Sequence, residues 1–193
     1  MAESGAQFMQ LQIFILGILW EGNNHPYEIK KLIQKNISDE EIVKVNDGTL
    51  YYRFETLLKK GYIEKIEVSR ENNRPERTTY GITDHGRDAL KRDIYKSFQN
   101  FSNLRSLYAS LLFLKHVDIG KIIDLTEKAI ERTKKRFQLQ NDSQLPEWWG
   151  IYSEKVSENI DFITSHARSN TEYDLEWLEK LLIFLRTMAT DNV

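Results

Sequence analysis

The chain has 193 residues, of which 40% are hydrophobic and 29% are charged, so it can bury a substantial core in one large domain or two small ones. It contains no Cys, which excludes disulfides, Cys-ligated metals and thiol nucleophiles. The net charge of −2 excludes a uniformly basic nucleic-acid-binding surface but allows a local basic patch.

The first predicted element is a helix over residues 8–21, which we expect at the centre of a core because it is apolar on nearly every face. Its apolar run, residues 11–20, is too short to span a bilayer, which takes about 20 residues. No basic residue precedes the run, as a signal peptide would require. We therefore expect a cytoplasmic protein, and the lack of Cys agrees with this.

Two shorter helices are predicted next. Pro26 suits the first position of the second helix, and Asp47 is the expected N-cap of the third. Gly61 is expected to end the third helix, because glycine readily takes the left-handed conformation found there. The third helix has an apolar stripe at helical spacing, made up of Leu50, Phe54, Leu57 and Leu58.

The hydrophobic period then changes from helical spacing to alternation. Apolar and polar side chains alternate over residues 62–68 and 77–82, and a polar, turn-rich stretch separates the two runs. This pattern predicts a β-hairpin with a long tip. Thr83 is the expected N-cap of a fourth helix. Three helices, a hairpin and a further helix in this order are typical of a winged helix-turn-helix domain.

The second half of the chain is predicted to be helical. Residues 84–115 suggest helix with a break near 101–103, and Asp118 is the expected cap of a helix over 119–139. From residue 147 onward, apolar side chains recur at steps of three and four, through a weak region at 169–171. A helix that long needs a partner surface, most simply the same helix of a second subunit.

These features resemble the PadR family of bacterial transcriptional regulators. The stretches that carry the resemblance are residues 11–22, 25–29, 48–51, 57–63, 73–77, 80–86, 172–173 and 177–179. The chain departs from the family pattern at four positions. Pro26 stands where Gly is usual, Tyr52 where Pro is common and Asn73 at the wing Gly, while Glu76 interrupts a more basic wing tip.

The resemblance implies a mainly α-helical fold with a small β-hairpin. It predicts a winged helix-turn-helix DNA-binding domain over residues 1–92 and a helical dimerisation and effector domain over 93–193. The implied function is a homodimeric transcriptional repressor that binds double-stranded operator DNA and is relieved by a small aromatic effector. The alternative is a dimeric winged-helix module that binds proteins and not DNA, which the acidic total and Glu76 motivate.

Polar side chains outside the apolar stripe of the third helix are the candidate DNA contacts. Arg53 is the best candidate for base readout, because Arg paired with guanine is the commonest specific contact. As an ordinary helix, this face would simply be solvated. The wing adds arginines that suit phosphate contact. The candidates are Thr49, Tyr51, Tyr52, Arg53, Lys59, Arg70, Arg74 and Arg77, and Tyr51 is included because of the resemblance.

Aromatic side chains in the second half suggest a site for a flat effector. Packing in the core or in a subunit interface is the default explanation for them, and a pocket for phenolic acids or drugs is the alternative. The candidates are Trp148, Trp149, Tyr152, Phe162 and His166.

No enzymatic function, cofactor or metal site is expected. The four His residues are not spaced as metal ligands on one helix, and the sequence has no Gly-rich phosphate loop and no nucleophile elbow.

Overall fold

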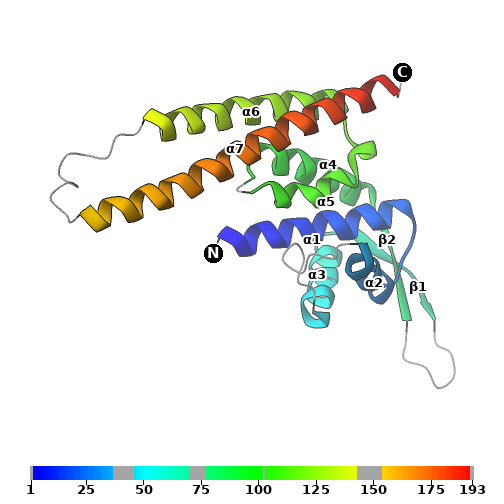
Figure 1. The fold of residues 1–193 in the computed structure, drawn as a ribbon. Helices are drawn as coiled ribbons and strands as arrows, with labels where there is room; N and C mark the ends of the chain where they lie inside the picture. Colours follow the sequence, from blue (N-terminus) through cyan, green and yellow to red (C-terminus); the bar gives the residue numbers. More distant parts are fainter. Residues whose placement is uncertain (1, 37–45, 70–76, 102, 143–153, 192–193) are drawn as a thin grey trace. The chain divides into compact units, whose positions relative to one another are not determined.

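The structure is a computed structural model that describes residues 2–36, 46–69, 77–101, 103–142 and 154–191 (Figure 1). It is mainly α-helical with one small antiparallel hairpin, which confirms the predicted fold class. The chain forms two compact units, Met1–Asp118 and Ile119–Val193. The predicted domain boundary at residues 92 and 93 falls inside a helix of the first unit, α4 (Asp84–Gln99).

Helix α1 (Ala2–Glu21) is the centre of the first unit and begins earlier than the predicted residue 8. Helices and a strand from later in the first unit pack around it, so its apolar side chains and some of its polar side chains are removed from water. The buried apolar residues are Leu11, Ile13, Phe14, Ile15, Leu16 and Leu19. In the described part of the chain, no helix is both long enough and apolar enough to cross a membrane.

Helices α2 (Pro26–Asn36) and α3 (Asp47–Lys59) follow, and the N-cap of α3 is Asn46 and not the predicted Asp47. Asn46 has extended backbone, and its side-chain oxygen accepts a hydrogen bond from the Thr49 amide at 2.7 Å. Asn and Asp are equally good caps, so side-chain chemistry could not choose between neighbours. Gly61 ends the helix as predicted, with a φ of 68°.

Strands β1 (Ile63–Ser69) and β2 (Arg77–Ile82) form the predicted hairpin. Ile63 pairs with Ile82 at its base, and the register shifts by a β-bulge between Lys65 and Glu67. Such a bulge bends the strand and increases its twist. Backbone hydrogen bonds between Asn24 and Tyr80, at 2.9 and 3.0 Å, fasten the turn before α2 to strand β2.

Helix α4 (Asp84–Gln99) begins at the predicted cap, because the Thr83 hydroxyl accepts from the Gly86 amide at 3.0 Å. Helix α4 ends at Gln99, which agrees with the break predicted near residues 101–103, but the described residues 103–115 do not form one helix. Short elements follow instead, namely η1 (Leu104–Leu107), α5 (Tyr108–Leu111) and the 3₁₀ helix η2 (Leu114–His116). The Asn103 side chain accepts from the Ser106 amide, which favours a new helical start at this point.

The second unit is an antiparallel pair of long helices, α6 (Ile119–Asp142) and α7 (Glu154–Asp191). Helix α7 runs without a break through the predicted weak region, where Thr171 is buried and its hydroxyl donates to the Ala167 carbonyl at 3.0 Å. The predicted helix start at residue 147 lies outside the described residues. Ion pairs between the described parts of the two helices include Glu127–Arg186, Lys134–Glu179 and Arg136–Asp174, at 2.7, 3.0 and 3.2 Å.

Candidate nucleic-acid interface

Helix α3 buries one face and exposes the other. Leu50, Phe54 and Leu57 are fully buried, so the predicted apolar stripe packs into the first unit. On the other face, Tyr51 and Tyr52 are 49% and 63% exposed, and the Lys59 side chain is exposed as well. Thr49 is half-buried beside the N-terminus of the helix. The exposed face therefore offers hydroxyl groups and a cation, which are groups that can contact base edges and phosphates.

Tyr80 of β2 packs against the buried side of α3, and it was not among the predicted site residues. Its ring packs against Phe54 of α3, with 5.0 Å between centroids. Burial raises the pKa of the Tyr80 hydroxyl, and the nearby Glu55 carboxylate and Tyr51 raise it further. Alternation over residues 77–82 predicted the strand, but it did not predict that Tyr80 would contact α3.

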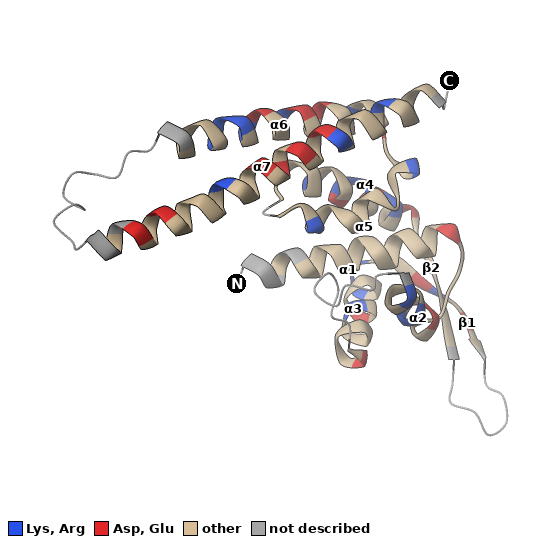
Figure 2. Ribbon diagram, in the orientation of Figure 1, with Lys and Arg blue, Asp and Glu red and all other residues tan. Residues whose placement is uncertain are grey.

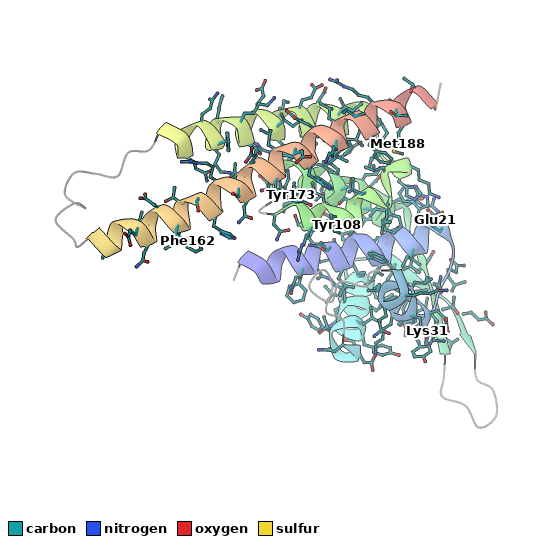
Figure 3. All side chains as sticks on the ribbon, viewed as in Figure 1. Glu21, Lys31, Tyr108, Phe162, Tyr173 and Met188 are labelled. Carbon is teal, nitrogen blue, oxygen red and sulfur yellow. The ribbon has the colours of Figure 1, made fainter. Side chains whose placement is uncertain are left out.

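Helix α2 adds cations that the sequence analysis left out. Lys30 forms an ion pair with Asp47 at 2.6 Å, which ties α2 to the first turn of α3. Lys31 is exposed and lies 4.5 Å from the centroid of the Tyr27 ring, which is itself 48% exposed (Figure 3). The signal was present in the sequence as three Lys within the eleven residues of α2, at 30, 31 and 35.

Arg53 does not extend freely from α3. Its guanidinium donates a hydrogen bond to the backbone carbonyl of Phe8 in α1 and lies over the Phe8 ring, 5.1 Å from the centroid. Burial lowers the pKa of Arg53, and the Asp93 carboxylate opposes this effect. To reach a base edge, the guanidinium would have to leave the Phe8 carbonyl.

The wing candidates are only partly described. Arg70 and Arg74 lie outside the described residues. Arg77 begins β2, where its backbone pairs with Ser69, and its side chain is outside the description. Along α2 and α3, the charges are mixed in sign (Figure 2).

The effector candidates are only partly described. Trp148, Trp149 and Tyr152 lie outside the described residues. Phe162 and His166 are one turn apart on α7, and both are exposed, Phe162 to 77%. The His166 ring lies 3.3 Å from the Asn170 amide nitrogen. Among the residues that the structure describes, no group of three or more His, Cys, Asp or Glu is placed to hold a metal ion.

Comparison with known proteins bears on the first unit. Residues 15–92 match the family described as the transcriptional regulator PadR-like family. This match spans α1 from Ile15, the helices α2 and α3, the hairpin and the first half of α4. A comparison with curated proteins gives no match.

Several solved structures are similar to this chain at low identity. Bacillus subtilis PadR in complex with operator DNA is 16% identical, with a TM-score of 0.38, over 91% of this chain and 98% of that one. The same protein in complex with p-coumaric acid is 16% identical, with a TM-score of 0.37, over 92% and 99%. The protein smu.1604c of Streptococcus mutans UA159 is 22% identical, with a TM-score of 0.40, over 93% and 98%.

Proposed function

Because residues 15–92 belong to the PadR-like family of transcriptional regulators, we propose that this chain is a sequence-specific DNA-binding regulator and not an enzyme. The observation that carries the proposal is the way in which α3 is held in the first unit. This helix is capped at Asn46, anchored by a buried apolar face and fastened to α2 and β2, and its opposite face exposes Tyr51, Tyr52 and Lys59. A rigid helix with polar groups on its free face suits readout in the major groove.

The proposed division of labour follows the predicted domains. Residues 1–92 bind DNA, with α3 in the major groove and the hairpin along the neighbouring backbone, and residues 93–193 join two subunits. The proposed contacts from the described side chains are Thr49, Tyr51, Tyr52 and Lys59. Arg70, Arg74 and Arg77 are the proposed phosphate contacts of the wing.

A homodimer is proposed from the free face of α7. Phe162, Tyr173 and Phe184 are 77%, 65% and 54% exposed and recur every eleven residues, which is about three helical turns, so they form one stripe. The labelled side chains of Phe162 and Tyr173 can be followed along α7 in Figure 3. An exposed aromatic stripe outside the buried face of Leu178, Leu181 and Leu185 is suited to a second copy of the helix.

Repression relieved by an aromatic effector is the finer part of the proposal. Two half-sites on one face of B-DNA are about one helical turn apart. A ligand that changes the distance between the two DNA-binding domains of the dimer would therefore release the operator. Trp148, Trp149, Tyr152, Phe162 and His166 are the proposed contacts. Titration with a phenolic acid should quench tryptophan fluorescence and weaken operator binding together.

The test of DNA binding uses the full chain. Retention on heparin at low salt is followed by a mobility-shift assay with the DNA upstream of the chain's own gene and with a scrambled duplex of equal length. We expect a salt-dependent shift that favours the upstream DNA, and Lys59→Ala should weaken it more than Lys128→Ala on α6. If the protein is not retained and shifts neither duplex, the alternative of a dimeric protein-interaction module is favoured.

A further inference from the structure

Arg53 connects α3 to the central helix α1. Its guanidinium both donates to the Phe8 carbonyl and lies over the Phe8 ring, at 5.1 Å from the centroid. The Nε atom is buried and has no hydrogen-bond partner among the described residues. The Arg53 side chain is therefore directed toward α1, although the preceding Tyr51 and Tyr52 on the same helix are exposed.

The surroundings of Arg53 continue this connection to α4. The Asp93 carboxylate of α4 attracts the Arg53 charge. Asp93 is itself buried and accepts a hydrogen bond from the Gln12 amide at 2.5 Å. Gln12 is one turn after Phe8 on α1, so the polar groups that meet Arg53 and Asp93 come from the same part of α1. Buried polar groups linked in this way specify one arrangement of the elements that carry them.

We propose that Arg53 is a positioning residue that fixes α3 against α1 and so sets the orientation of the face with Tyr51 and Tyr52. This inference rests on the proposed DNA-binding function. Base-edge hydrogen bonds form only over a narrow range of distances, so a tilt of α3 that moves its outer atoms by about 1 Å would break them. Arg53 therefore acts on recognition through Phe8, without touching a base.

The first experiment measures the contact without DNA. Free energies of unfolding are determined for wild type, Arg53→Met, Phe8→Ala and the double variant. We expect the two substitutions to be non-additive, because each removes one side of the same contact. Additive effects would show that Arg53 and Phe8 do not interact, and would overturn the inference.

The second experiment measures recognition with the same variants, together with Arg53→Lys. Dissociation constants are determined for operator and random DNA at several salt concentrations. We expect Phe8→Ala to weaken operator binding by roughly 2- to 5-fold, the fold-change that corresponds to a partly exposed cation–π contact. Arg53→Lys should lose affinity as well, because an ammonium cannot reproduce the planar stack. The salt slope should stay at the wild-type value, since no phosphate contact is lost.

Arg87→Met is the matched control. Arg87 also lies over an aromatic ring of α1, 5.4 Å from the Trp20 centroid, but it comes from α4 and not from α3. We expect it to lower stability without changing the ratio of operator to random affinity.

Three results would overturn the inference. If Phe8→Ala leaves operator affinity unchanged while Arg53→Met removes discrimination at one base pair, Arg53 reads that base. If Arg53→Met lowers the salt slope by about 0.9, Arg53 binds phosphate. If the wild-type chain binds no DNA, the proposed function fails and the recognition role with it, although the coupling to Phe8 in the first experiment would remain measurable.

Discussion

Glu21 is a residue whose role depends on a segment far along the chain. It ends α1, and its carboxylate accepts from Lys115 at 2.5 Å and pairs with His116 at 2.8 Å, both in η2 (Figure 3). The His116 ring stacks on Trp20 with 4.1 Å between centroids. The hydrogen bond from Lys115 is the main cause, and that with His116 the next, of a Glu21 pKa below its usual value. This cluster fastens the last turn of α1 to η2.

We predict that Glu21→Gln lowers stability at neutral pH by roughly 0.2–1 kcal/mol, the range for exposed ion pairs, because water screens this contact. Since the folded pKa is lowered, the stabilisation is present above the usual glutamate pKa and is lost as the pH falls through the folded pKa. Urea unfolding at a series of pH values measures the difference. Wild type and Glu21→Gln should converge in acid, and Glu131→Gln on α6 should match wild type throughout. A difference in unfolding free energy between wild type and Glu21→Gln that does not depend on pH would show that the charge of Glu21 is not its cause.

At the scale of elements, α4 packs against the start of the hairpin without a gap. A Cβ built on Gly86 would overlap the backbone carbonyl of Tyr62 and come within 2.8 Å of the Ile82 side chain. The Thr83 hydroxyl, which caps α4, also donates to the Gly61 carbonyl at 2.6 Å. The helix start, the end of α3 and the base of the hairpin therefore form one packed junction.

We predict that Gly86→Ala destabilises the chain by about 1–3 kcal/mol or more, because a backbone carbonyl cannot move aside as a flexible side chain can. The midpoint of denaturant unfolding measures this. Gly22→Ala is the control, since a Cβ at Gly22 would meet no atom within 4 Å. Equal midpoints for the two variants would show that the junction is looser than the structure has it.

The hairpin is the second element with a testable role. Proline has a fixed φ, so we expect Pro75 to reduce the entropy lost in the proposed docking of Arg74 and Arg77 on DNA. We predict that Arg74→Ala and Arg77→Ala each lower the slope of log affinity against log salt by roughly 0.9 and weaken all sequences about equally. Glu76→Gln should strengthen binding, because it removes a charge that repels the phosphates. Equal salt slopes and affinities for wild type and all three variants would mean that the hairpin does not touch DNA.

At the scale of the whole molecule, the proposed dimer depends on α7. Sedimentation at micromolar concentration should give about twice the chain mass of 22.8 kDa. We predict that Tyr173→Lys combined with Phe184→Lys shifts the protein to monomers, because two cations in the aromatic stripe would be desolvated without partners. Gln138→Lys, at an exposed position of α6, should remain dimeric. A wild-type monomer at this concentration would contradict the proposed dimer.

The sequence by itself determined the elements whose signals are local. Pro26, Thr83 and Gly61 marked helix ends by chemistry that acts within a few residues. Alternation over residues 62–68 and 77–82 predicted both strands, because a side-chain period of two needs no knowledge of the partner. The exposed face of α3 followed equally from the spacing of Leu50, Phe54 and Leu57.

The tertiary structure alone decided where individual side chains point. Periodicity placed Arg53 outside the apolar stripe, yet its guanidinium meets Phe8, which is 45 residues away in the sequence. Local signals predicted a break near residues 101–103, but not the short elements after it, in which Leu104, Leu107 and Leu114 are buried. Contacts between distant segments depend on how whole helices pack. A long, flexible side chain can reach several different partners, so the local sequence does not determine which one it contacts.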